Sequence, residues 1–123
     1  MIPVMQKLRH NPENNVKGDC LRACICSLLE ISDENVPNFV DDDNYPEKLY
    51  EWLQNKNLLF YYSDDPPKGI EYYMAWGTSP RGSKHSVICK CGKLVHDPHP
   101  DGGDVVNVTT YAWIETNKAG DSQ

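Results

Sequence analysis

The hydrophobic period of the chain changes halfway along it, and this change constrains the fold more than any other feature of the sequence. Before residue 58, apolar residues recur three and four positions apart, as in Leu21, Cys24, Ile25, Leu28 and Leu29, and this spacing predicts one face of an α-helix. After residue 58, short runs of β-branched and aromatic residues are separated by turns rich in glycine and proline, which is typical of strands. Helices followed by strands predict an α+β domain with an antiparallel sheet.

Two helices are expected in the first half. The first begins at residues 18–19 and ends before residues 32–35, which have the composition of a helix cap. The second begins after Asn44 or Asp43, with Pro46 in its first turn. Its buried stripe is expected to consist of Leu49, Trp52 and Leu53.

The second half is expected to form the sheet. A tight turn at Gly92-Lys93 would join two of its strands into a hairpin. Residues 111–114 are expected to pack at the sheet edge. The strands are predicted over residues 58–62, 70–76, 85–91, 94–95 and 105–108.

Length and composition bound the organisation of the chain. Its 123 residues suffice for one core, so we expect a polar leader over residues 1–17, a single domain over 18–116 and a flexible tail over 117–123. The sequence contains neither a signal peptide nor an apolar run long enough to span a membrane. The five cysteines are therefore expected to be reduced thiols in the cytoplasm.

The charge of the chain argues against a nucleic-acid partner. The net charge is −6, and only 12 lysines and arginines are present, whereas phosphate binding needs clustered cations. A peptide or a small amide or thioester is the expected partner. The oligomeric state is left open by the sequence.

Cys20 lies at the mouth of the first predicted helix, where free N–H groups and the helix dipole lower a thiol pKa. A catalytic thiol also needs an imidazole within reach, held by an acceptor. His85 heads a strand and Asp97 follows the next one, so the hairpin would bring their ends side by side. We therefore expect Cys20 to be a nucleophile, His85 its general base and acid, and Asp97 the group that orients His85.

A hydrolase of this kind also needs hydrogen-bond donors for an oxyanion. The backbone N–H of Cys20 is one candidate. A side-chain amide upstream is the second candidate, from Asn14 or Asn15 or from the more distant Gln6.

The three other histidines are expected to be non-catalytic. His99 stands between two prolines and is the one expected to line the cleft. His96 alternates away from Asp97 on its strand, and His10 lies in the polar leader.

This ordered set of residues resembles the papain-like fold, and most closely the C39-like branch of cysteine peptidases. The resemblance covers residues 14–105 and implies the roles given above for the thiol, imidazole and carboxylate. It also places Asn14 and Asp19 on the oxyanion and substrate side, where His99 is expected to line the cleft. Small acidic versions of this pattern look like proteins encoded in bacterial and phage genomes. The matching segments are Asp19-Cys20-Leu21-Arg22-Ala23, His85-Ser86-Val87-Ile88 and Asp97-Pro98.

The chain departs from the family at two positions. The family usually has a glutamine six residues before its cysteine, where this chain has Asn14, and a glycine after the cysteine, where it has Leu21. Two functions therefore stay open. One is a thiol-dependent hydrolase or acyltransferase that cleaves an amide, isopeptide or thioester bond. The other is a non-catalytic binding or inhibitor module that uses the 79–84 loop and the acidic residues 41–43 for recognition.

A four-thiolate zinc site is the competing interpretation of the cysteines. Cys24 and Cys26 form one pair, and Cys89 and Cys91 the other. Helical positions 24 and 26 point about 200° apart, which is a poor arrangement for two ligands of one ion. No metal or cofactor is expected.

Overall fold

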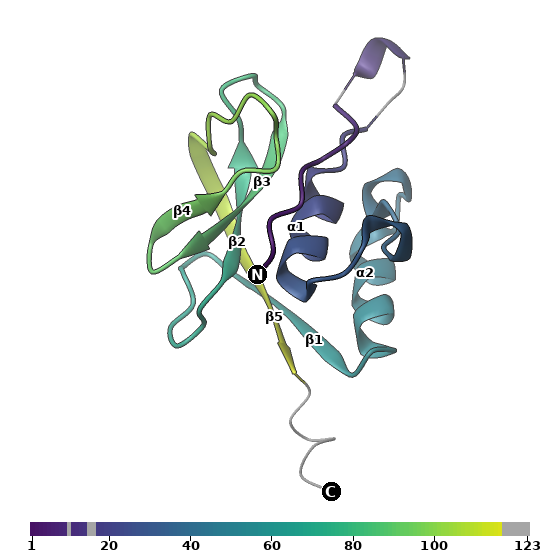
Figure 1. The fold of residues 1–123 in the computed structure, drawn as a ribbon, viewed down its shortest axis with the longest axis vertical. Coiled ribbons are helices and arrows are strands. Elements are labelled where there is room, and N and C mark those ends of the chain that lie inside the picture. Colours follow the sequence, from purple (N-terminus) through teal and green to yellow (C-terminus); the bar gives the residue numbers. More distant parts are fainter. Residues whose placement is uncertain (10, 15–16, 117–123) are drawn as a thin grey trace, which may run out of the picture.

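The structure, a computed structural model, describes residues 1–9, 11–14 and 17–116. These residues form two α-helices on one side of a five-stranded antiparallel sheet (Figure 1). The α+β class expected from the sequence is confirmed. None of the described helices has the length and apolar character needed to cross a membrane.

The strand order in the sheet is β1-β5-β2-β3-β4. β5 lies between β1 and β2 and pairs with both. The prediction of two separate segments over residues 105–108 and 111–114, with the second at the edge, is wrong. Residues 107–116 instead form one continuous central strand, because they pair with a neighbouring strand on each side. The strands are β1 (Leu58–Ser63), β2 (Tyr73–Thr78), β3 (Lys84–Lys90), β4 (Lys93–His96) and β5 (Asn107–Thr116).

The β3–β4 hairpin turns one residue earlier than predicted. Its turn residues are Cys91 and Gly92, with φ angles of 53° and 78°, and two left-handed residues in succession are typical of a type I′ turn. Lys93 then pairs with Lys90 in the ladder. β2 also differs from its prediction, because it begins at residue 73 and continues through residue 78.

The helices follow their predictions closely. α1 (Cys20–Leu29) ends at Glu30, which has a left-handed φ of 59° and donates its N–H to Cys26. α2 (Tyr45–Gln54) begins after Asn44 with a proline in its first turn. Three 3-10 helices also occur, η1 (Pro12–Asn14), η2 (Asp33–Asn35) and η3 (Phe39–Asp41). The core between helices and sheet includes Leu21, Cys24, Ile25, Leu49, Leu53, Met74, Ile88 and Ala112.

A β-bulge in β5 lies beside Gly77 of β2, next to the start of β3. The register of β2 against β5 shifts between Trp76 and Gly77, and Gly77 is paired with His85 on its other side. A Cβ at Gly77 would overlap the carbonyl oxygen of Asn107. A glycine at this position therefore lets β5 approach β2 directly beside His85.

The first nine residues, here called the N-terminal strap, pack against the domain. The strap runs between α1 and the β3–β4 side of the sheet (Figure 1). Its backbone N–H at Ile2 donates to Ser27 O in α1 (3.1 Å), and its N–H at Gln6 donates to Pro98 O (2.9 Å). The strap therefore connects the helix to the segment that follows β4.

Candidate active site

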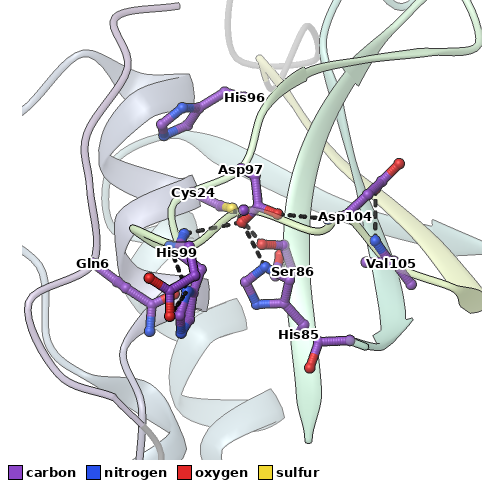
Figure 2. A network of polar contacts seen from close by, with 12 residues as sticks. Gln6, Cys24, His85, Ser86, His96, Asp97, His99, Asp104 and Val105 are labelled. Atoms are coloured by element: carbon purple, nitrogen blue, oxygen red, sulfur yellow. Dashed lines mark hydrogen bonds and ion pairs between the residues drawn. The ribbon is translucent and has the colours of Figure 1, made fainter. Parts of the chain in front are cut away.

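His85 and Asp97 form a buried hydrogen-bonded pair (Figure 2). His85 Nε2 lies 2.7 Å from Asp97 Oδ1, and the two side chains are only 4% and 8% exposed. His85 is the second residue of β3, and Asp97 directly follows β4. The strand ladder ends where Ile88 pairs with His96, so the pair forms beyond the ladder and is joined through side chains.

The Asp97 carboxylate organises the loop that follows it. It accepts the backbone N–H of His99 at Oδ1 (2.9 Å) and that of Asp104 at Oδ2 (2.9 Å), besides the bond from His85. Burial raises the pKa of Asp97, but the hydrogen bonds from His99, His85 and Asp104 outweigh it and hold the pKa below its usual value. The carboxylate therefore stays ionised and accepts all three donors.

This arrangement fixes the tautomer of the His85 ring. A carboxylate only accepts hydrogen bonds, so Nε2 donates and, in the neutral ring, Nδ1 carries a lone pair. No hydrogen bond to Nδ1 is present within the described part of the chain. His85 therefore offers an unoccupied basic nitrogen that is held in place from its opposite side.

Cys20 is the first residue of α1, is half-buried, and has a free thiol. Burial raises its pKa, and backbone hydrogen bonding from Ser86 and Leu21 lowers it by less, so the net direction is upward. The sequence predicted the opposite direction, because the degree of burial could not be inferred from it. Ser86, whose backbone lowers the pKa of the Cys20 thiol, is the residue that follows His85 in β3.

Cys24, one helical turn later, contacts Ser86 directly. Its sulfur donates to Ser86 O (3.4 Å), and burial raises its pKa well above the usual value. Cys20 and Cys24 are one turn apart and so share one face of α1, and the Cys24 sulfur contacts the backbone of Ser86. Cys24 thus fastens the helix start to β3 and is chemically the less accessible of the two thiols.

Asp19, which the resemblance places near the oxyanion, anchors the N-terminal strap. Its side chain is 2% exposed and accepts the backbone N–H groups of Lys7 (2.9 Å) and Leu8 (2.8 Å). It also accepts a bond from Arg22 Nη2 (2.7 Å). These bonds occupy the carboxylate and hold the strap directly before Cys20.

Gln6 is the upstream amide that the strap brings to the site, whereas Asn14 is exposed and lies in η1. Gln6 is 7% exposed, and its Nε2 donates to Leu8 O (2.8 Å). Its backbone N–H holds Pro98 O, next to Asp97. Gln6 is also the one glutamine that precedes Cys20 in the sequence, and it was the most distant of the three amides named as candidates. Asn15 lies outside the described residues.

His99 packs edge-on against His85, with ring centroids 6.1 Å apart at 80°. Its Nδ1 accepts the backbone N–H of Asp101 (3.0 Å), which requires Nδ1 to be unprotonated. Burial, with the nearby guanidinium groups of Arg81 and Arg9, lowers the pKa of His99. The ring is therefore neutral and carries its proton on Nε2.

The remaining histidines and cysteines lie apart from this arrangement. His96 is buried, and its Nε2 donates to Val4 O in the strap (2.7 Å). His10 is outside the described residues. Among the described residues no group of three or more histidine, cysteine or acidic side chains could hold a metal ion, so Cys24, Cys26, Cys89 and Cys91 do not converge there.

No protein-family model matches this chain, and no curated protein or solved structure matches it either.

Proposed function

We propose that the protein is a thiol-dependent hydrolase or acyltransferase that acts on an amide, isopeptide or thioester bond. The supporting observation is the buried His85–Asp97 bond of 2.7 Å, with the Cys20 thiol against the residue that follows His85. Burying an ionisable pair adds little to stability compared with apolar packing. Ionisable groups held in this way, next to a thiol, are typical of catalytic sites.

The raised pKa of Cys20 defines the role of His85. A resting thiol must lose its proton during attack, so Nδ1 of His85 accepts that proton as the sulfur bonds to the substrate carbonyl carbon. Asp97 stabilises the imidazolium that forms. His85 then protonates the leaving group, which leaves an acyl-thioester on Cys20. Water or an acceptor amine, deprotonated by His85, resolves this intermediate.

Gln6 is the side-chain donor that we assign to the oxyanion. An amide NH₂ carries two hydrogens, and Leu8 O accepts one of those on Gln6 Nε2. The second hydrogen and the backbone N–H of Cys20 would together bind the developing negative charge. Asp19 acts indirectly, because it holds the strap on which Gln6 lies.

Replacing Gln6 with alanine is expected to lower kcat about 100-fold with little change in Cys20 alkylation. The alkylation reaction forms no oxyanion, so it isolates this role from thiol activation. Asn14→Ala is the matched control and is expected to retain activity. Equal losses in the two variants would contradict the assignment.

We extend the proposal to a papain-like architecture of the C39-like branch, in a cytoplasmic protein of bacterial or phage type. The support is the order of the parts: a helix that begins with Cys20, then a strand that begins near His85, then Asp97 after the next strand. Unrelated folds can carry the same three groups. The chemistry proposed above therefore does not depend on this extension.

The proposal is tested by the pH dependence of Cys20 alkylation with iodoacetamide, read by mass spectrometry of the labelled peptide. Because burial raises the Cys20 pKa, fast labelling at pH 6 to 7 would indicate that His85 takes up the thiol proton. We expect a His85-dependent rate at this pH that is lost in His85→Ala. Exposed Cys91 serves as the reference thiol in the same sample.

A non-catalytic binding or inhibitor module is the second candidate, and the upward pKa of Cys20 favours it. In that case the thiol would react only near pH 8.5 or above, as an unassisted thiol does. Its rate would also be the same in wild type and His85→Ala. A His85-dependent rate at pH 6 to 7 therefore supports the thiol-dependent enzyme. A His85-independent rate that appears only near pH 8.5 or above supports the binding module.

A further inference from the structure

A cationic rim surrounds His99, the imidazole that contacts His85. Arg81 belongs to the loop after β2, and its Nη1 donates to Gly102 O (2.7 Å). Arg9, at the end of the N-terminal strap, lies 3.5 Å from Asp101 Oδ2. Both partners belong to the loop that carries His99, so two guanidinium groups from distant parts of the sequence meet at one edge of the site.

Hydrogen bonds from Ser79 hold the Arg81 loop. Ser79 is 1% exposed, and its Oγ accepts the backbone N–H of Arg81 (3.2 Å), while its own N–H donates to Ser83 O (2.9 Å). A guanidinium group has five N–H donors, and Gly102 O uses one of those on Arg81. Arg81 is exposed, so further donors are available to a ligand.

The cations at this edge are Arg9 and Arg81. Lys84, directly before His85 in β3, is exposed, and its side chain points to the other face of the sheet from His85. Asp101, 61% exposed, opposes them. Asp104, on the same loop, is half-buried, and its carboxylate accepts the N–H of Val105 (2.6 Å).

The aspartates of this loop offset the cations, and Arg9 pairs with Asp101. Within the described part of the chain no carboxylate pairs with Arg81, so its guanidinium group is the cation left for a ligand. Asp97 is buried and bonded to His85. The pKa of His99 is lowered first by burial and next by Arg81, while Asp101 raises it and Arg9 lowers it by less than that.

We propose that the site selects substrates that carry a carboxylate beside the bond attacked, bound by Arg81 and Arg9. The inference rests on the proposed function, because it concerns what that site accepts. An acidic side chain and a free C-terminus present the same chemistry to a guanidinium group. Charge complementarity of this kind acts on encounter and on orientation.

The first test compares Cys20 alkylation by anionic iodoacetate and by neutral iodoacetamide at about pH 7 and low salt. The ratio of the two rate constants cancels the thiolate fraction and reports local charge. We expect Arg81→Gln and Arg9→Gln each to lower this ratio about twofold. Lys56→Gln, just beyond the C-terminal end of α2, is expected to leave it unchanged. About 0.5 M salt is expected to lower the wild-type ratio and not that of the double variant.

The second test does not need a reactive thiol. Acetyl-glutamate amide, acetyl-glutamine with a free carboxylate, and acetyl-glutamine amide are titrated while the His99 and His85 ring proton resonances are followed. Saturable shifts with either anion, absent with the neutral amide and in the double arginine variant, support the proposal. The responding anion identifies the side-chain or the terminal carboxylate.

The outcomes separate the two proposals. A slow iodoacetamide reaction at Cys20 contradicts the catalytic function alone, while the histidine titration still decides the anion preference. Equal ratios in wild type and the arginine variants, with equal shifts for the neutral and anionic ligands, would overturn the carboxylate preference alone.

Discussion

Replacing Cys20 with alanine is expected to lower turnover of a small activated ester, such as p-nitrophenyl acetate, by about 10³-fold or more. The acetyl group is small, so the measurement does not depend on the natural substrate. In wild type we expect a burst of p-nitrophenol as the acyl-thioester forms at Cys20, followed by slower release. Without the sulfur no such intermediate forms, and the burst disappears.

The fold of this variant should be intact, because Cys20 is half-buried and loses one sulfur atom. Thermal unfolding of Cys20→Ala checks this point. Cys91→Ala, which removes an exposed thiol from the hairpin turn, is the matched control and should keep the burst. A full burst in Cys20→Ala would exclude this residue as the nucleophile.

The helices could be predicted from the sequence because their signals are local. The apolar stripe of residues 21–29 and the Asn44–Pro46 start depend on neighbouring residues only. β5 could not be predicted in this way, because its length results from pairing with β1 on one side and β2 on the other. Nothing within residues 105–116 indicates which strands will flank them.

The candidate site shows the same difference between features that local sequence predicts and features that depend on the assembled fold. The order of thiol, imidazole and carboxylate along the sequence was sufficient to select Cys20, His85 and Asp97, and a hairpin brings the last two together. Gln6 was only the most distant of three candidate donors, because fourteen positions separate it from Cys20. The backbone bonds that Asp19 accepts from the strap bring it close to the site. The direction of the Cys20 pKa depends on burial, which is a property of the assembled fold.

Replacing Asp97 with alanine is expected to affect both activity and stability. Three donors, from His85, His99 and Asp104, would lose their acceptor in a buried position. Unsatisfied buried donors of this kind predict a loss of about 2–4 kcal/mol in the free energy of unfolding. Loss of the ring orientation of His85 predicts a fall in kcat of about 10³-fold. Urea unfolding and the ester assay measure the two effects.

Asp97→Asn separates the two roles and gives a pH signature. Its Oδ1 can still accept from His85 and His99, but its amide would face the N–H of Asp104, so we expect a smaller loss of stability than in the alanine variant.

The folded-state pKa of Asp97 is below the usual 3.8, so the carboxylate stabilises the fold above about pH 3.8. This contribution is lost as the pH falls through the lower folded-state value. The stability difference between wild type and Asp97→Asn should therefore be constant near neutral pH and shrink below about pH 4. Asp64→Asn, an exposed change of the same kind, should show no such difference, and a gap that widened in acid would contradict an ionised Asp97 in the folded protein.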